Sequence, residues 1–201
     1  MLGAAVLVAL TLVLAIAFVA LSSTYLARLR EEAHAVPPAV EKAQTQIRAV
    51  PVVVWLDSTS VHVTIALLRA VQGSELAIGF LPLAQTESGY EPLPHSALLY
   101  VGSGVLYPTA ALEQQTVDPS KVLMIVDGDV MDASRALGIT SPLYVSQIIV
   151  ANGNTWVELV LPTPRSLGVD SYTLKILLCV QYNDGWFAFG EIAERVPPSS
   201  G

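Results

Sequence analysis

Three aspartates stand close together in the stretch DGDVMD at 127–132. Carboxylate oxygens are the hard ligands that Ca²⁺ prefers, so Asp127, Asp129 and Asp132 are the candidate metal ligands of this chain. The stretch lacks the other positions of an EF-hand loop, including its bidentate glutamate. A calcium site here is therefore the less favoured of two interpretations.

The favoured interpretation of the same stretch is structural. Asp127-Gly128 is typical of a turn, Asp129 is expected to cap a short helix through DASRAL at 132–137, and Gly138 is expected to end that helix. On this interpretation the acidic residues shape the backbone, and we expect neither a metal ion nor a cofactor.

Histidine and cysteine indicate no clearer site. His34, His62 and His95 lie far apart in the chain and share no metal-ligand spacing. His34 is expected on the surface of a stalk, and His62 on the solvent face of a strand. Cys179 lies in the apolar run KILLCV, which favours a small core residue, and the sequence indicates no base that would activate its thiol.

Catalytic motifs are also missing, since the chain has no G-x-S-x-G, P-loop, G-x-G-x-x-G or H-E-x-x-H sequence. Three carboxylates fall in predicted loops, and the sequence does not pair them in space: Glu87, Glu91 and Glu113. Three tryptophans are expected to anchor a core or an interface rather than a sugar: Trp55, Trp156 and Trp186. We therefore expect that this chain is not an enzyme.

Composition narrows the classes of partner. The 201 residues are 53% hydrophobic and 13% charged, and the net charge is -7. This acidic balance argues against binding to nucleic acid or to an anionic membrane surface. The single cysteine excludes an intramolecular disulfide and a metal site made of several cysteines.

The first charged residue is Arg28, so the segment 1–27 is uncharged. As a helix it would be about 40 Å long, which exceeds the ~30 Å hydrocarbon layer of a bilayer. A secretory signal would have a basic n-region and a shorter apolar core, and this segment has neither. The sequence therefore predicts a long apolar helix that can cross a bilayer, and it favours removal of a basic leader ahead of Met1.

Small side chains interrupt this predicted helix. Ala5 and Ala9 have the small-xxx-small spacing at which two helix backbones approach closely. The predicted helix-packing positions are Gly3, Ala5, Ala9, Ala15, Ala17 and Ala20. We expect this helix to pack against other helices as well as lipid, and the alternative is an ordinary single-pass anchor.

Two prolines divide the residues that come next. Residues 28–36 keep a helix-forming composition, Pro37-Pro38 disfavours helix at the preceding residue, and a second helical run is expected at 39–49. Residues 1–50 are therefore expected to form a hydrophobic helix and stalk, and residues 51–201 an extracellular β-domain.

The second region has the texture of an antiparallel β-domain. Apolar residues alternate with polar or small ones over 61–67, and tight turns are expected at Asn152-Gly153 and Asp184-Gly185. Loops are expected at 86–96 and 102–120. Further predicted strands are 51–57, 75–82, 97–101, 121–127, 143–151, 155–162, 172–182 and 186–193. The predicted fold class is α+β, a long N-terminal hydrophobic helix followed by an antiparallel β-sandwich, with an immunoglobulin-like sandwich favoured.

The order of an uncharged helix followed by a β-domain resembles the archaeal-type pilin superfamily, which comprises type IV pilins and archaellins. The resemblance covers residues 1–50 by pattern and the remainder by architecture, and the glutamate usual near the start of bacterial type IV pilins is missing. It implies processing by a prepilin peptidase, insertion in the membrane, and assembly by dedicated machinery into a helical homopolymer with the N-terminal helices in its core.

The functional hypothesis is a structural subunit of an extracellular pilin-like filament at the cell surface, inserted in the membrane before assembly. Adhesion and motility both stay open, with a slight preference for an adhesion pilus. The alternative is a single-pass, membrane-anchored extracytoplasmic β-domain that binds a partner as an accessory of a surface machine.

Overall fold

The computed structural model describes residues 36–69, 75–101, 110–150 and 154–198. The chain divides into two compact units, Met1–Pro37 and Pro38–Gly201, and we call the second the β-unit. Several sequence predictions lie outside the described residues: the apolar helix at 1–27, with Gly3, Ala5, Ala9, Ala15, Ala17 and Ala20, the stalk residue His34, and the turn at Asn152-Gly153.

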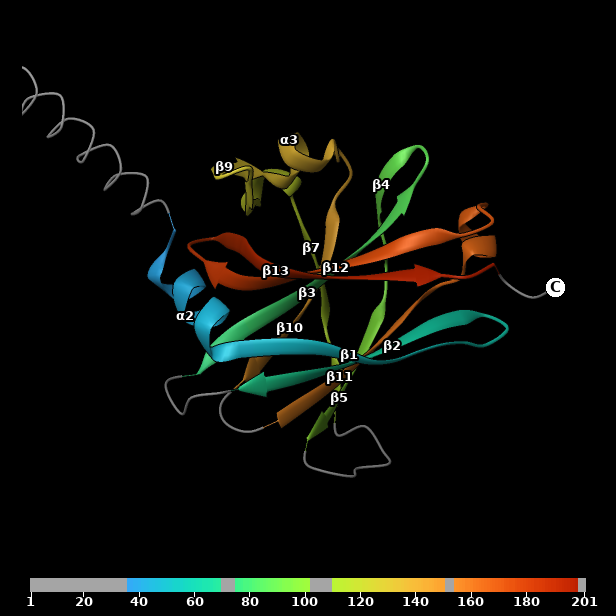
Figure 1. Cartoon of the computed structure of the whole chain (residues 1–201), viewed down its shortest axis with the longest axis horizontal. Helices are drawn as coiled ribbons and strands as arrows, with labels where there is room; N and C mark the ends of the chain where they lie inside the picture. The colour runs from blue at the N-terminus through green and yellow to red at the C-terminus, as the bar shows by residue number, and fades with distance from the viewer. Residues whose placement is uncertain (1–35, 70–74, 102–109, 151–153, 199–201) are drawn as a thin grey trace, which may run out of the picture. The chain divides into compact units, whose positions relative to one another are not determined.

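The described residues form a β-rich fold (Figure 1), with 66% of them in strands and 14% in helices. The helical elements are short: α2 (Pro38–Gln46), α3 (Ala133–Leu137) and the 3₁₀ turns η1 (Pro119–Lys121) and η2 (Pro164–Leu167). Among the residues that the structure describes, no helix has the length and apolar character needed to cross a membrane. The predicted α+β class, a long apolar helix leading an immunoglobulin-like sandwich, is wrong for the described residues, which form a β-rich fold with short helices. The β-branched and aromatic residues from Ile47 onward favour strands over helix.

Two sheets make up the β-unit. Sheet A has the spatial order β1 (Ile47–Leu56), β2 (Ser60–Arg69), β11 (Asn154–Pro162), β5 (Ser96–Val101) and β6 (Ala110–Leu112). Sheet B has the order β7 (Gln114–Val117), β10 (Leu143–Val150), β3 (Leu76–Thr86), β12 (Tyr172–Tyr182), β13 (Gly185–Val196), β8 (Val122–Val126) and β9 (Asp129–Asp132), and β4 (Gly89–Pro92) also pairs with β3.

One strand pair departs from the antiparallel domain that the sequence predicted. β13 and β8 run parallel, with Trp186 beside Val122 and Phe187 beside Leu123. Parallel neighbours cannot be joined by a tight hairpin, and β8 and β13 are far apart in the chain. The predicted loops are corrected in part, because 86–96 contains β4 and 102–120 contains β6 and β7.

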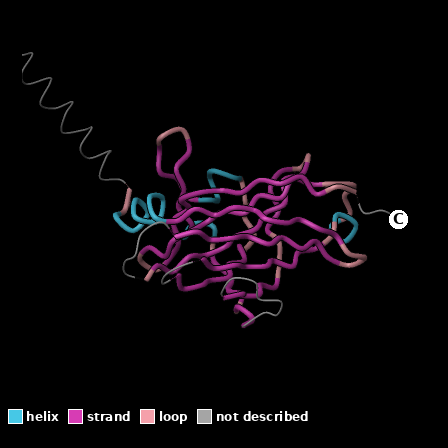
Figure 2. Tube along the Cα trace, turned by 60° about the horizontal axis from the view of Figure 1, so that its bottom comes forward, coloured by secondary structure: helices cyan, strands magenta, loops and turns pink. Residues whose placement is uncertain are grey.

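The main core lies between the two sheets. The alternation predicted over 61–67 is confirmed, because Val61, Val63, Ile65 and Leu67 of β2 are fully buried. They belong to one apolar cluster with side chains from β3 and β12 of sheet B, which include Phe80. Figure 2 shows how strands dominate this unit, with helical turns at its margins.

A second apolar cluster lies on the opposite face of sheet B. It contains Leu81 of β3 and Leu177 of β12, together with Cys179, whose predicted burial is confirmed. The segment 119–139, which comprises η1, β8, β9 and α3, covers this face and contributes buried residues such as Ala133. We call this segment the cover.

Helix α2 belongs to the β-unit. Its buried residues are Val40 and Ala43, and it lies against β12 and β13. The helical run predicted at 39–49 ends at Gln46, and β1 begins at Ile47. Both α2 and the first residues of β1 therefore belong to the unit that starts at Pro38.

Two tight turns show different reasons for glycine. The predicted turn at Asp127-Gly128 is confirmed, since both residues have positive φ, 53° and 93°. The second turn was predicted at Asp184-Gly185, but the residue with positive φ there is Asn183, at 52°. Gly185 is the first residue of β13, and a Cβ there would lie 2.2 Å from the carbonyl oxygen of Lys121. Glycine at 185 thus permits close contact with the cover.

Candidate functional site

The outer face of sheet A is the part of the β-unit where polar and aromatic side chains gather. Antiparallel register places Trp55 of β1 beside His62 of β2, and Glu158 of β11 beside Thr64 of β2. Tyr100 of β5 lies on the next strand along. Four neighbouring strands therefore contribute to one surface, because residues of equal parity point to the same side of a sheet.

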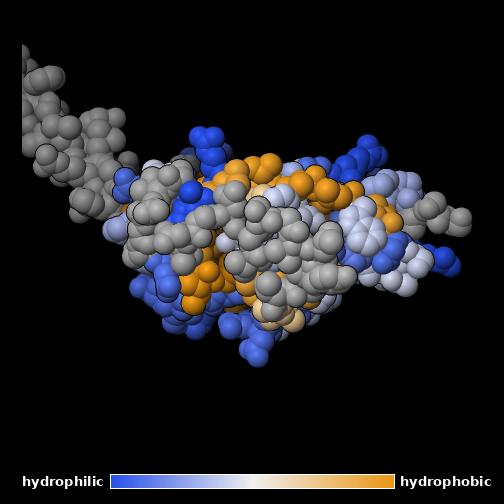
Figure 3. Space-filling model, turned by 90° about the horizontal axis from the view of Figure 1, so that it is seen from below, coloured by the Kyte–Doolittle hydropathy of each residue, from blue (hydrophilic) through white to orange (hydrophobic). Residues whose placement is uncertain are grey.

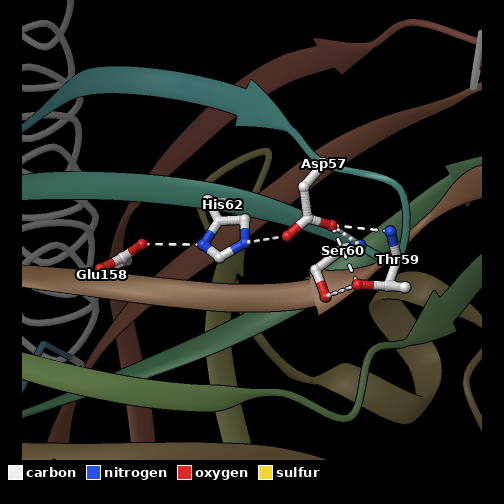
Figure 4. A network of polar contacts seen from close by, with 5 residues as sticks. All are labelled: Asp57, Thr59, Ser60, His62 and Glu158. Atoms are coloured by element: carbon white, nitrogen blue, oxygen red, sulfur yellow. Dashed lines mark hydrogen bonds and ion pairs between the residues drawn. The ribbon is translucent and has the colours of Figure 1, made fainter.

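His62 lies between two carboxylates (Figure 4). Its Nδ1 is 2.8 Å from Oε1 of Glu158, and its Nε2 is 3.2 Å from Oδ2 of Asp57. The other oxygen of Glu158 accepts a hydrogen bond from the Tyr100 hydroxyl at 2.5 Å. The side chains of His62 and Glu158 are each 14% exposed. This chain of contacts, here called the His62 network, joins strands β2, β11 and β5 to the β1–β2 turn.

The turn between β1 and β2 holds Asp57 in place. Its Oδ1 accepts hydrogen bonds from the backbone N–H groups of Thr59 and Ser60 at 2.7 and 2.6 Å, and from the Thr59 hydroxyl at 3.0 Å. The two backbone hydrogen bonds, with smaller help from His62, lower the pKa of Asp57 to about 2.

Trp55 covers the imidazole of His62. The two rings are stacked, with centroids 3.8 Å apart and planes 10° apart, and Trp55 is still 43% exposed. At the other end of the network, the hydrogen bond to Glu158, followed by burial, raises the pKa of Tyr100 to about 12.

The geometry of the network does not suit nucleophilic catalysis. In a Ser-His-acid triad one ring nitrogen faces a nucleophile and the other a carboxylate. Both nitrogens of His62 face carboxylates, and the Ser60 hydroxyl lies beside the Thr59 hydroxyl, 3.5 Å away. The network instead ties strands β2, β11 and β5 to the β1–β2 turn.

The candidate metal ligands have structural positions. The cap of α3 is Asp132 and not Asp129, which corrects the predicted cap: its Oδ1 accepts hydrogen bonds from the Arg135 backbone N–H at 3.1 Å and from the Ser134 hydroxyl. Asp129 begins β9, and Gly138 ends α3 in the left-handed conformation at φ 68°, as predicted. Among the described residues, no group of three or more His, Cys, Asp or Glu side chains could hold a metal ion.

The other residues considered from sequence do not meet. His95 is buried, with Nδ1 3.2 Å from the Leu93 carbonyl oxygen, and burial lowers its pKa. Burial likewise raises the pKa of the Cys179 thiol to about 12. Of the tryptophans, Trp186 is buried in the second cluster, whereas Trp55 and the half-buried Trp156 lie on the outer face of sheet A.

A polar cleft of about 900 Å³ lies at the end of the unit where the β3–β4 turn approaches the start of β12. Glu87 lines it, as do Asp170 and Arg195, and several hydroxyl side chains surround them. The other two loop carboxylates do not line this cleft: Glu91 lies on β4, and Glu113 lies between β6 and β7.

Sequence reasoning singled out Trp55 and His62 but missed Asp57, Tyr100 and Glu158. The turn that joins β1 to β2 could have suggested the pairing of Trp55 with His62, because a hairpin sets its own register. Glu158 is 96 residues from His62 in the chain, so its contact requires the register of β11 on β2. No protein-family model matches this chain, and no match was found among curated proteins.

Proposed function

We propose that this chain is the repeating subunit of an extracellular pilin-like filament. In this proposal the uncharged segment at 1–27 forms the shared apolar core, and the β-units tile the outside. Before assembly the segment resides in a membrane, and a prepilin peptidase and assembly machinery act on the chain, as its resemblance to pilins implies.

Within the β-unit, one observation supports the proposal: most of its exposed large apolar side chains lie on two neighbouring strands. Of the eight large apolar side chains that are exposed in the described residues, five lie on β1 and β2: Val50, Val52, Val53, Trp55 and Leu68. Figure 3 views the unit from below, the side of sheet A, and shows apolar side chains gathered between polar ones. Contiguous exposed apolar surface is typical of contacts with another macromolecule.

The chemistry of the described residues also favours a structural role. Both ring nitrogens of His62 are occupied by carboxylates, and the Cys179 thiol is enclosed in a core. A subunit that polymerises needs complementary surfaces rather than an open reactive group.

The test is electron microscopy of material sheared from cells that express the full chain. We expect filaments that contain this protein, and we expect Ala15→Asp to abolish them because it places a charge in the shared apolar core. Ala193→Asp is the matched control, because Ala193 is exposed on β13 and should tolerate the same change. Normal filaments from the Ala15→Asp variant would contradict the proposal.

The polar cleft beside Glu87, Asp170 and Arg195 favours a second candidate, a membrane-anchored protein whose β-unit binds a polar ligand. The same microscopy separates the two functions. A protein that stays in the membrane fraction as single copies, with no filaments in the sheared material, would favour the anchored binding protein.

A further inference from the structure

The β8–β9 hairpin presents a small apolar surface with an acidic tip. Ile125 and Val130 face each other across the hairpin, and they are 38% and 37% exposed. Asp127 and Asp129 are exposed at its turn, and neither forms an ion pair within the described ranges. The hairpin thus combines an apolar pair with uncompensated negative charge.

The β1–β2 end of sheet A presents the complementary combination. Arg48 of β1 pairs with Leu68 of β2, and both side chains are exposed beside Val50. Arg48, like the two aspartates of the hairpin, forms no ion pair in the part of the chain that the structure describes. We call Arg48, Val50 and Leu68 the β1 patch.

The two surfaces lie on different parts of one β-unit, with β9 far from β1 in Figure 1. They therefore cannot meet within one copy of this unit. A contact that uses two different surfaces is heterologous, and when its rotation does not close a ring it propagates into a helical filament.

We propose that the β8–β9 hairpin of one copy docks on the β1 patch of the next copy, head to tail. This inference rests on the proposed filament and names the surfaces through which its outer units meet. Val130 and Ile125 pack against Val50 and Leu68, and the aspartates of the hairpin tip lie opposite Arg48.

Charge selects this arrangement over the two symmetric ones. Hairpin against hairpin would bring the aspartates of both copies together, and patch against patch would oppose two arginines. Of these three arrangements, the heterologous contact places opposite charges face to face.

Strand addition at the β1 edge is also disfavoured. Pro51 has no backbone N–H, and the register of β1 on β2 shifts between Pro51 and Val53. Proline and a bulge are features that protect an edge strand from pairing with another chain. The side chains of β1, rather than its backbone edge, are therefore the docking surface.

Crosslinking of the full chain tests this contact directly. The only cysteine, Cys179, is fully buried, so a short bis-maleimide will react with cysteines introduced at the surface. A chain that carries both Val50→Cys and Val130→Cys keeps Arg48 and both aspartates, and it should give a ladder of dimers, trimers and longer products. A mixture of the two single variants should stop at dimers, because each copy then has one reactive surface.

The matched control pairs Val130→Cys with Arg165→Cys, because Arg165 is exposed on η2 and forms no ion pair among the described residues. This control should give no ladder, and a ladder of equal intensity would overturn the contact. Microscopy of the same preparations separates the two proposals. Filaments without the 50–130 ladder would overturn the contact alone, and the ladder without filaments would overturn the filament alone. Absence of both would overturn both.

Discussion

The outer faces of sheets A and B both contain apolar side chains, but only those of sheet B are covered by another segment of the described chain. Both sheets place apolar residues on the side that faces away from the main core. On sheet B the cover, 119–139, encloses them in a second cluster with Ala133 and Trp186. On sheet A the His62 network binds the strands together, and apolar residues such as Val53 and Trp55 stay exposed. One face is covered by a segment of the same chain, whereas the other keeps apolar side chains exposed.

The largest contrast between the two faces is expected from truncating an apolar side chain on each. Leu81→Ala removes a fully buried side chain under the cover and should lower the free energy of unfolding by about 2–5 kcal/mol. Val53→Ala on sheet A removes a side chain that is 48% exposed and should change it by less than about 0.5 kcal/mol. Urea denaturation of the full-length variants measures both, and equal losses would contradict the contrast.

A second prediction concerns the attachment of the cover. In Gly185→Ala the new Cβ would lie 2.2 Å from the Lys121 carbonyl oxygen, which must move because it is backbone. We expect a loss of roughly 1–3 kcal/mol, as for other overpacked sites, and faster amide hydrogen exchange in 119–139. Gly190→Ala is the matched control, because Gly190 has no positive φ and a Cβ there would lie 3.6 Å from its nearest neighbour, Leu178 Cδ1, which is an ordinary contact distance. Unchanged exchange in 119–139 would show that the cover does not depend on this contact.

A third prediction addresses the His62 network. Glu158→Gln removes the carboxylate that His62 and Tyr100 share, and should cost about 1–2 kcal/mol because the hydrogen bonds to a charged group are lost. The same change should move the pKa of Tyr100 from about 12 toward its ordinary value of 10.0, since the bond to Glu158 is the main cause of the shift. Ultraviolet titration of the tyrosines reports the second effect. A Tyr100 titration that stays as in the wild type would argue against the network.

The smallest expected effect is the acid dependence that Asp57 contributes. Its pKa is about 2 in the folded chain and 3.8 ordinarily, so the unfolded chain takes up a proton first as the pH falls. The stabilisation by Asp57 is therefore complete above about pH 4 and is lost as the pH falls through about 2. Comparing Asp57→Asn with the wild type between these values should show a flatter stability profile for the variant. Parallel profiles would exclude this contribution.

Several features of the fold arise from local sequence alone. The alternation over 61–67 predicted the fully buried residues of β2, which are Val61, Val63, Ile65 and Leu67, because successive strand residues point to opposite sides. The pair Asp127-Gly128 predicted a turn because both residue types accept positive φ. Asp129 was expected to cap α3 because aspartate suits that position, yet Asp132, of the same type and three residues on, makes the hydrogen bonds.

Local sequence accounts for the β-rich character of the residues from Pro51 onward, a buried Cys179 and an uncharged segment at 1–27. Tertiary structure alone decided which sheet face acquired a cover, that β8 runs parallel to β13, and that Glu158 meets His62. The physical reason is that side-chain alternation marks the two faces of a strand, whereas the neighbours of each face come from strands distant in the chain, whose pairing has no local signal.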